Sequence, residues 1–462
     1  MKKLLTAAAL FSLTLTATAQ KEDSLFIRRM ADEILVNSKA YENLRVLTKQ
    51  IGARLAGSPQ MVKAEQWGLK AMQAAGPDKA WFQQCMVPHW VRGGRDLFQA
   101  ERLVSSDGKN KKWSTSYLDV LALGNSQGSN GAIRAQVMMV RDFAELEAKK
   151  DSVKGKIVFY NYKFNPTFVR TFQAYSDAVA YRGQGPSRAA KYGAKGTIVR
   201  SMSHSTDNNP HTGGMSYADS LPKIPAVAVG LKDADWLDST LGRTTVFATM
   251  QTAGHFLPDT IGNNVIGELR GTEFPNQYIT IGGHLDSWDA AEGAHDDGAG
   301  VVQTIEVLRV LKAMGYKPRH SIRFVLFANE ENGTRGGRKY AEEAKAKGEQ
   351  HIFALESDAG GFTPRGFGFT GPEAQYQKIL AWKDLLAPYG ASEIVRGGGG
   401  SDIAPLGREL GTPLCGFLPD SQRYFDYHHA RNDIFENVNK RELELGAVNM
   451  AALIYLIDKY GL

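Results

Sequence analysis

The chain has 462 residues, which is enough for roughly two or three domains. Apolar residues make up 43% of it and charged residues 23%, and these globular proportions exclude a chain that is disordered throughout. Two cysteines are too few for a disulfide scaffold or a cysteine-built zinc finger. The net charge of +6 comes from scattered basic residues, so no nucleic-acid partner is predicted.

The first residues are typical of an export signal. Two lysines precede an apolar run over residues 4–15 and a small-residue cleavage site at Ala17–Ala19. We therefore predict a signal peptide over residues 1–19 and an exported protein, periplasmic or secreted. The run is too short to span a bilayer, so no integral membrane segment is expected after cleavage. Outside the cytoplasm, Cys85 and Cys415 either pair or stay as buried thiols, and we favour the thiols.

The next elements are helices over residues 22–76 and strands over 80–104. Over residues 111–255 the pattern changes to short β-type runs separated by turns, with one helix near 174–192. We interpret this stretch as an inserted, mostly-β domain between two segments of a main domain, 20–110 and 256–462. The predicted inserted strands are Ala135–Val140, Lys156–Asn161, Gly196–Arg200 and Ile224–Val229.

From about residue 261 the pattern alternates between strand and helix. The predicted strands are Tyr278–Gly283, Ser321–Ala328 and Ile352–Ser357, and the predicted helices are Ala299–Met314 and Thr334–Lys347. This alternation predicts an α/β fold with a doubly wound, mostly parallel sheet.

Acidic residues and histidine follow the ends of these strands. They are His284 and Asp286, then Asp296 and Asp297 at the entry to the next helix, Glu330 and Glu331, and Asp358. Ligands bind beyond the carboxyl ends of the strands in an open α/β sheet, so these side chains are expected at one rim. Carboxylates crowded together repel one another unless cations neutralise them. The mixed donor set suits zinc, and it suits cobalt or manganese less definitely.

Five ligating side chains exceed one tetrahedral site, so a carboxylate that bridges two metals fits the count better. Paired metals are a recurring arrangement for hydrolysis. The fifth ligand is expected to be a histidine near the C-terminus, where His428 and His429 are the two candidates.

At this point the motifs resemble those of a known family, the co-catalytic di-zinc exopeptidases that include bacterial leucyl aminopeptidases and glutamate carboxypeptidase. The segments that carry the resemblance are Gly282–Trp288, Gly293–Gly300, Asn329–Gly333, Glu356–Asp358, Gly400–Ile403 and Tyr424–His429. Within residues 111–255, Tyr192–Gly196 and Ile224–Val227 resemble a protease-associated domain. The resemblance implies a zinc exopeptidase fold with that domain inserted.

The resemblance also implies a role for each matching residue. It makes Glu330 the general base and Asp286 the carboxylate that orients a ligating histidine, and it implies two zinc ions per chain. The implied metal ligands are His284, Asp296 as the bridging carboxylate, Glu331, Asp358 and His429. His429 is chosen over His428 because the family places an acidic residue four positions after the ligand, here Asp433. Asp296 is expected to have an unusual peptide link to Asp297.

The remaining site predictions concern the substrate. His428 either donates a hydrogen bond to the oxyanion or is a packed neighbour of the ligand. The glycine run before Ser401 and Asp402 forms a pocket wall or a plain loop, and Tyr424 is a further candidate for the pocket. A peptide or dipeptide is the expected substrate. Relatives of this type suggest a homodimer, while the sequence itself leaves the oligomeric state open.

Two other functions compete with an aminopeptidase or dipeptidase. A glutaminyl cyclase of the same fold would use a single zinc ion, and a receptor would have lost ligands. All five ligand positions are intact, which favours the exopeptidase. One departure from the family is Ile434, since the family often has threonine there.

Overall fold

The computed structural model describes residues 21–107 and 110–462, so the predicted signal peptide lies outside the described residues. Two eight-stranded sheets organise the chain. The first sheet has, in spatial order, β1 (Lys79–Val91), β10 (His255–Leu269), β12 (His320–Phe327), β11 (Phe274–His284), β13 (Gln350–Glu356), β16 (Leu414–Pro419), β14 (Pro364–Thr370) and β15 (Glu393–Arg396).

The centre of the first sheet is parallel. β11 runs parallel to both β12 and β13, and β13 runs parallel to β16. β1 and β10 are antiparallel at one edge, and β14 is antiparallel to β16. Every residue of β12 is buried, as expected for a strand that is covered on both faces.

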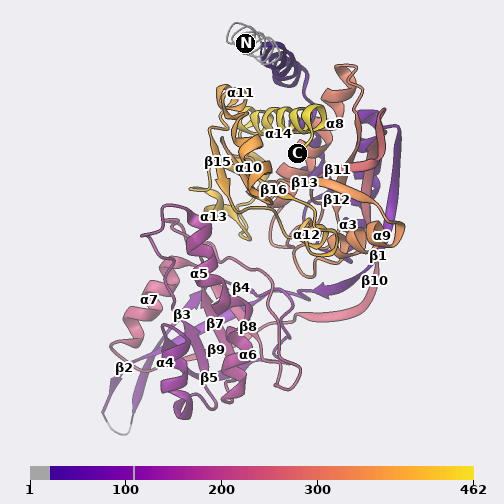
Figure 1. The fold of residues 1–462 in the computed structure, drawn as a ribbon. Helices are drawn as coiled ribbons and strands as arrows, with labels where there is room; N and C mark the ends of the chain where they lie inside the picture. The colour runs from indigo at the N-terminus through magenta and orange to yellow at the C-terminus, as the bar shows by residue number, and fades with distance from the viewer. Residues whose placement is uncertain (1–20, 108–109) are drawn as a thin grey trace, which may run out of the picture.

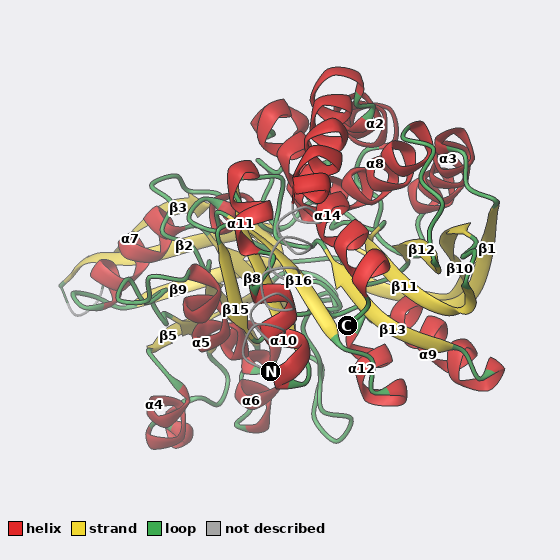
Figure 2. Cartoon of the chain, turned by 45° about the horizontal axis from the view of Figure 1, so that its top comes forward, coloured by secondary structure: helices red, strands yellow, loops and turns green. Residues whose placement is uncertain are grey.

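Helices cover both faces of this sheet, which confirms the doubly wound architecture (Figure 2). One face carries a helix over residues 21–37, α2 (Ala40–Val46), α3 (Pro59–Ala75), α8 (Ala299–Ala313) and α14 (Lys440–Tyr460). The other carries α9 (Arg335–Lys347) and α12 (Ala404–Leu410). The remaining elements of this part are α10 (Glu373–Leu380), α11 (Lys383–Leu386), α13 (Tyr424–Tyr427) and the turns η1 (Leu47–Ile51), η3 (Ala294–Gly298), η4 (Ala387–Tyr389) and η5 (Phe435–Asn437).

Local sequence explains where α3 begins and ends. The Ser58 hydroxyl accepts a hydrogen bond from the backbone N–H of Met61, and Pro59 occupies the first turn, where a missing N–H costs nothing. Gly76 ends the helix in the left-handed conformation. This fixes the helical N-terminal part against the first sheet.

The second sheet is built from residues 97–251, which we call the insert unit. Its strands, in spatial order, are β3 (Lys111–Leu118), β2 (Leu97–Ser106), β9 (Val246–Gln251), β5 (Ile133–Val140), β6 (Ile157–Tyr160), β7 (Gly196–Arg200), β8 (Ala226–Val229) and β4 (Val120–Ala122). Its helices are α4 (Phe143–Ala148), α5 (Thr171–Gly183), α6 (Gly185–Lys191) and α7 (Leu231–Leu241), with the turn η2 (Lys150–Ser152). Apolar clusters fill both faces of this sheet.

The insert unit leaves the first sheet between its two antiparallel strands β1 and β10. Figure 1 shows it, largely in magenta, as a separate body reached through the ends of those strands. α5 and the loop around residue 212 lie on the side that faces α13 and the strand ends of the first sheet. The insert unit therefore forms one wall over the rim where the predicted ligands lie.

Three further observations belong to the fold. Cys85 and Cys415 are both buried free thiols. The Asp296–Asp297 peptide bond is cis. Among the helices that the structure describes, none is long and apolar enough to cross a membrane.

Candidate metal centre

The candidate site lies at the carboxyl ends of β11, β12 and β13. His284 is the last residue of β11 and pairs in register with Phe327, the last residue of β12. Glu330 and Glu331 follow β12, and Asp358 follows β13. η3 brings its acidic residues to the same rim, since ligands of open α/β sheets bind beyond the carboxyl ends of the strands.

The first half of the site surrounds His284. Its Nε2 lies 3.3 Å from Asp296 Oδ1 and 3.4 Å from Asp358 Oδ1. Its Nδ1 contacts the carbonyl oxygen of Asp286 at 2.9 Å, an arrangement that leaves the Nε2 lone pair free for a metal. Within the described residues, this buried Nε2 has no hydrogen-bond partner.

The second half surrounds His429, which comes from the loop after α13. Its Nε2 lies 3.2 Å from Asp296 Oδ2 and 3.1 Å from Glu331 Oε2. Its Nδ1 lies 3.3 Å from the carbonyl oxygen of Thr212. The Glu331 carboxylate is also held by the backbone N–H of Trp288, at 3.2 Å.

Asp296 lies between the two histidines, with one carboxylate oxygen facing each. Two ligands at about 2.0–2.1 Å from a tetrahedral zinc ion are roughly 3.3 Å apart. The four distances in the two halves are 3.1–3.4 Å, so these residues fit zinc without rearrangement. Asp296 Oδ2 is a buried oxygen that lacks a hydrogen-bond partner in the described part of the chain, as expected for a metal ligand.

The electrostatics of the site call for cations. Burial raises the pKa of Glu331 and of Asp358, and neighbouring carboxylates raise both further. Burial also opposes ionisation of Asp296, but His284 and His429 outweigh it and keep its pKa well below the ordinary value. For His429, burial favours the neutral ring, yet Glu331 and Asp296 raise its pKa to about 9. The buried carboxylates therefore favour an added positive charge, either a proton on a neighbouring imidazole or a metal cation.

Asp286 supports the site through both its backbone and its side chain. The carbonyl oxygen orients His284, as described above, while the carboxylate accepts hydrogen bonds from the backbone N–H groups of Glu330 (3.0 Å) and Glu331 (3.3 Å). Burial raises the pKa of Asp286 to about 6. The sequence analysis expected the Asp286 carboxylate to orient His284, but its Oδ1 lies 3.8 Å from His284 Nδ1 and the carboxylate binds the backbone of the two glutamates instead.

Glu330 differs from the ligands in its exposure, since its side chain is half-buried. Burial raises the pKa of Asp358, His284 lowers it, and the charges of Asp296 and Glu330 raise it further. Glu330 directly precedes Glu331 and is only half-buried, so it lies at the edge of the site, where a proton acceptor for a substrate water is needed.

His428 lies against the second half. Its ring stacks on that of His429 at a centroid distance of 3.6 Å, and its Nε2 lies 3.7 Å from Asp296 Oδ2. The ligand atoms of Asp296, His428 and His429 lie close enough together to hold one metal ion. The same is true of His284, Asp296 and Asp358. His428 therefore competes with Glu331 for the remaining ligand position of the second half.

The residues predicted to bind substrate lie in different surroundings. Ser401 is exposed, whereas Asp402 is fully buried and its backbone N–H donates to Glu356 Oε2 at 3.0 Å. Tyr424 is buried, with its ring 5.2 Å from that of His428. Asp402 thus packs behind the rim with Glu356, a buried carboxylate that the sequence analysis did not single out.

Two further residues hold the backbone around the site and were not predicted from the sequence to do so. Asp433 accepts hydrogen bonds from the backbone N–H groups of His295 (2.7 Å) and Asp296 (3.1 Å), which fixes η3. Arg54 is fully buried and donates to three backbone carbonyls next to the site, and burial lowers its pKa to about 10. Asp433 was visible only through its spacing from His429, and no pattern in the sequence marked Arg54 as a residue that supports the site.

A cavity of about 1110 Å³ opens beside Asp358, at its neighbour Ala359. Apolar walls come from both units, with Phe168 and Phe172 from the insert unit and Leu418 from β16. Two ion pairs border it, Arg170 with Glu393 at 3.3 Å and Arg365 with Asp420 at 2.8 Å.

Known proteins share this organisation. Residues 264–454 match the model of peptidase family M28. Human carboxypeptidase Q is 31% identical over 422 residues, which are 91% of this chain and 85% of the human protein. The chain belongs to peptidase family M28.

Solved M28 structures agree with the fold. The peptidase M28 precursor from Shewanella amazonensis SB2B superimposes with a TM-score of 0.88 at 30% identity, over 95% of this chain and 97% of that one. A zinc aminopeptidase from Bacillus subtilis shares the fold, with a TM-score of 0.62 at 20% identity over 90% of this chain and 94% of that one. As an M28 member, this chain is a metallo-exopeptidase, and the predicted resemblance is confirmed.

Proposed function

We propose that this protein is an exported aminopeptidase or dipeptidase that holds two zinc ions and uses Glu330 as its general base. The observation that carries the proposal is the position of Asp296, whose two oxygens face the two histidines at 3.3 and 3.2 Å. One zinc ion would be held by His284, Asp296 and Asp358. The other would be held by Asp296, Glu331 and His429.

When bound, zinc lowers the pKa of water toward neutrality and polarises a scissile carbonyl. The chain's own residues do the rest. Glu330 accepts the proton of the attacking water and returns it to the leaving amine. The Asp286 carboxylate fixes the backbone of Glu330 and so sets its direction. His428, which stacks on His429, would donate a hydrogen bond to the developing oxyanion.

The substrate is a peptide with a free end close to the scissile bond. The cavity beside Asp358 is the proposed substrate pocket, and its phenylalanine and leucine walls favour an apolar side chain. Curated relatives include both carboxypeptidase Q and leucine aminopeptidases, so the choice between trimming peptides and splitting dipeptides is left to a peptide-library digest.

Export and assembly complete the proposal. The predicted signal over residues 1–19 supports release into the periplasm or the medium, and N-terminal sequencing of the mature protein tests it. We also propose that the insert unit is a protease-associated domain. A homodimer stays a prediction that sedimentation analysis would decide.

The test of the catalytic role is Glu330→Gln, which keeps the size of the side chain and removes its basicity. We expect zinc content to stay at the wild-type level while turnover of amino-acid nitroanilides or dipeptides falls about 10²–10⁴-fold. Glu342→Gln, at an exposed position of α9, is the matched control and should leave both unchanged. Wild-type turnover in the Glu330 variant would exclude it as the base.

A further inference from the structure

We propose that the insert unit completes the second half of the metal centre, with Thr212 and Arg182 acting as positioning residues for His429. The inference rests on the proposed two-metal function and adds a requirement to it. The described part of the chain outside the insert unit, which we call the first-sheet unit, provides the ligands but not the partner that orients His429.

The loop around Thr212 binds His429 in two directions. The Thr212 backbone N–H donates to the His429 carbonyl at 2.9 Å, and the Thr212 carbonyl lies 3.3 Å from His429 Nδ1. His429 itself has a left-handed backbone, with a φ of 62°, which a non-glycine residue adopts only when its surroundings hold it there. The insert unit thus fixes both the backbone and the ring of this residue.

Arg182 of α5 braces the same carbonyl. Its Nη1 lies 3.4 Å from the Thr212 carbonyl oxygen and 3.4 Å from His429 Nδ1, and its Nη2 donates to the Tyr175 hydroxyl at 2.6 Å. Arginine only donates, and a His429 that binds metal through Nε2 carries its proton on Nδ1, so in that form the Thr212 oxygen is the acceptor shared by the guanidinium and the Nδ1–H. This keeps the Nδ1 proton in place and directs the Nε2 lone pair toward Asp296 and Glu331.

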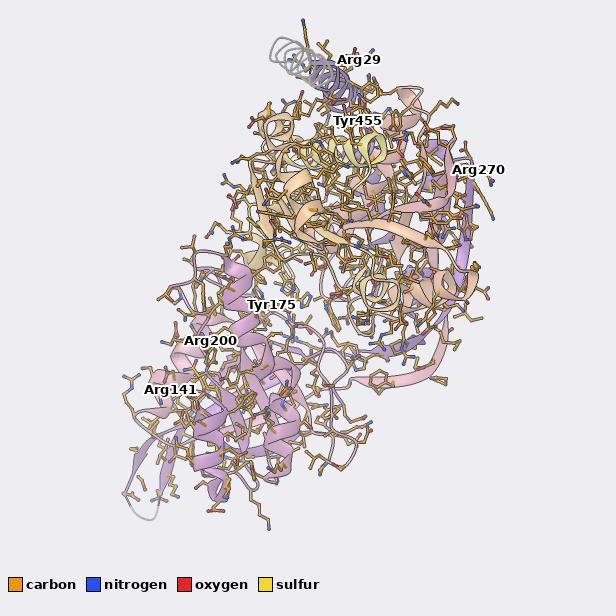
Figure 3. The ribbon with its side chains drawn as sticks, viewed as in Figure 1. Arg29, Arg141, Tyr175, Arg200, Arg270 and Tyr455 are labelled. Carbon is orange, nitrogen blue, oxygen red and sulfur yellow. The ribbon has the colours of Figure 1, made fainter. Side chains whose placement is uncertain are left out.

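Aromatic packing holds the rest of the loop that carries His429. Tyr175 lies 4.9 Å from the ring of Phe425 and 5.1 Å from that of His428, and Phe172 stacks on Tyr424. Figure 3 labels Tyr175 at the side of the insert unit that faces the first-sheet unit. These contacts explain how a loop that is not part of the sheet is held at ligand distance.

The two proposed histidine ligands therefore differ in the origin of their support. The Nδ1 of His284 meets a carbonyl two residues along its own chain segment, whereas the Nδ1 of His429 meets a carbonyl 217 residues away. Loss of such an orienting partner typically costs about 10–100-fold in metal affinity. We expect that loss to be confined to the second half.

Gly213 gives a sharp way to disturb the contact. A Cβ added there would lie 2.5 Å from Arg182 Cζ and 2.6 Å from His429 Nδ1, and its φ of 130° strains any other residue. A Cβ added at Gly183, on the same unit at the end of α5, meets nothing within 4 Å. Gly213→Ala and Gly183→Ala are thus a matched pair.

The experiment is a zinc titration of the metal-free protein against a chromophoric chelator. Wild type and Gly183→Ala should show two sites, while Gly213→Ala and Arg182→Gln should weaken one site about 10–100-fold and leave the other unchanged. In a His429→Ala background, Gly213→Ala should have no further effect on the surviving site, because the two changes act on the same half. Melting temperatures check that each variant is folded.

Wild-type affinity at both sites in Gly213→Ala and Arg182→Gln would overturn this inference and leave the proposed function standing. A wild-type protein with only one zinc site would overturn the two-metal function itself, and the inference with it. If Gly213→Ala does not fold, Arg182→Gln carries the same comparison, and Arg182→Lys should restore part of the affinity because lysine still donates to the Thr212 carbonyl.

Discussion

The two halves of the metal centre are built by different means. His284 and Asp358 stand at the ends of adjacent parallel strands, where hydrogen bonding of the sheet fixes their separation. His429 stands on a loop that the insert unit holds through Thr212 and the aromatic contacts of α5. The sheet alone therefore positions the first half, whereas the second half depends on the docking of the insert unit against the rest of the chain.

Asp296 joins the two halves, so its loss should have the largest effect. Asp296→Asn removes the charge that faces both histidines, and we expect zinc to be lost from both halves. Turnover should fall by roughly a thousandfold or more, which corresponds to about 4 kcal/mol. Asp235→Asn, on α7 of the insert unit, is the control. Zinc retained at two equivalents in the Asp296 variant would contradict a bridging role.

The next change separates the halves. His284→Ala and His429→Ala should each lower the zinc content by about one equivalent per chain and turnover by roughly 10²–10³-fold. Gly213→Ala should weaken the zinc that remains in His284→Ala, since that zinc is bound by the second half. Elemental analysis with chelator competition measures both effects. If Gly213→Ala weakened the remaining zinc equally in His284→Ala and in His429→Ala, the two halves would not differ in their support.

His428 and Glu331 offer a sharper test of the second half. If Glu331 is the ligand, Glu331→Gln lowers the affinity of one zinc ion by about 10–100-fold, while His428→Gln leaves both zinc ions in place and lowers turnover only. The reverse pattern in zinc titrations would make His428 the ligand, as its distance of 3.7 Å from Asp296 Oδ2 also permits.

The second half should also bind zinc in a pH-dependent way. A ligating histidine must be neutral, but in the metal-free protein Glu331 and Asp296 overcome burial and raise the pKa of His429 to about 9. Zinc binding at neutral pH therefore releases this proton, and affinity rises about tenfold per pH unit for each proton released, until the pH passes about 9. Calorimetry in two buffers of different ionisation enthalpy counts the protons. Zinc binding without proton release would show that the ring is already neutral.

The ion pair between Arg170 and Glu393 should have the smallest effect, although it also joins the two units. Both side chains are about half exposed, at 53% and 49%, and such pairs contribute about 0–1 kcal/mol. Arg170→Ala should therefore change zinc affinity by less than about twofold, unlike Arg182→Gln. A large loss of zinc in Arg170→Ala would mean that general docking, rather than the contact at His429, holds the second half.

Sequence patterns anticipated the half that the sheet builds. β11, β12 and β13 lie within a few residues of their predicted positions, since buried strands and the helices between them have clear apolar patterns. Acidic residues and histidine directly after such strands must meet at one rim, so His284 and Asp358 of the first half were predicted together, along with Glu331 of the second half. The predicted helix near 174–192 is confirmed as α5 and α6.

Local sequence patterns do not predict the second half, around His429. His429 was selected over its neighbour only through family spacing, and no periodicity shows that Thr212 lies against it across 217 residues. Arg182 looks in sequence like any basic residue on a helix. The carboxylate of Asp286 binds the backbone of Glu330 and Glu331, a contact that depends on loop geometry rather than on residue type.

The most direct test of the central claim is a crystal structure of the zinc-loaded protein with anomalous data at the zinc edge. We expect two zinc peaks on either side of the Asp296 carboxylate, about 3.5–4 Å apart, one next to His284 and one next to His429. A single peak, or an Asp296 side chain that contacts only one ion, would contradict it.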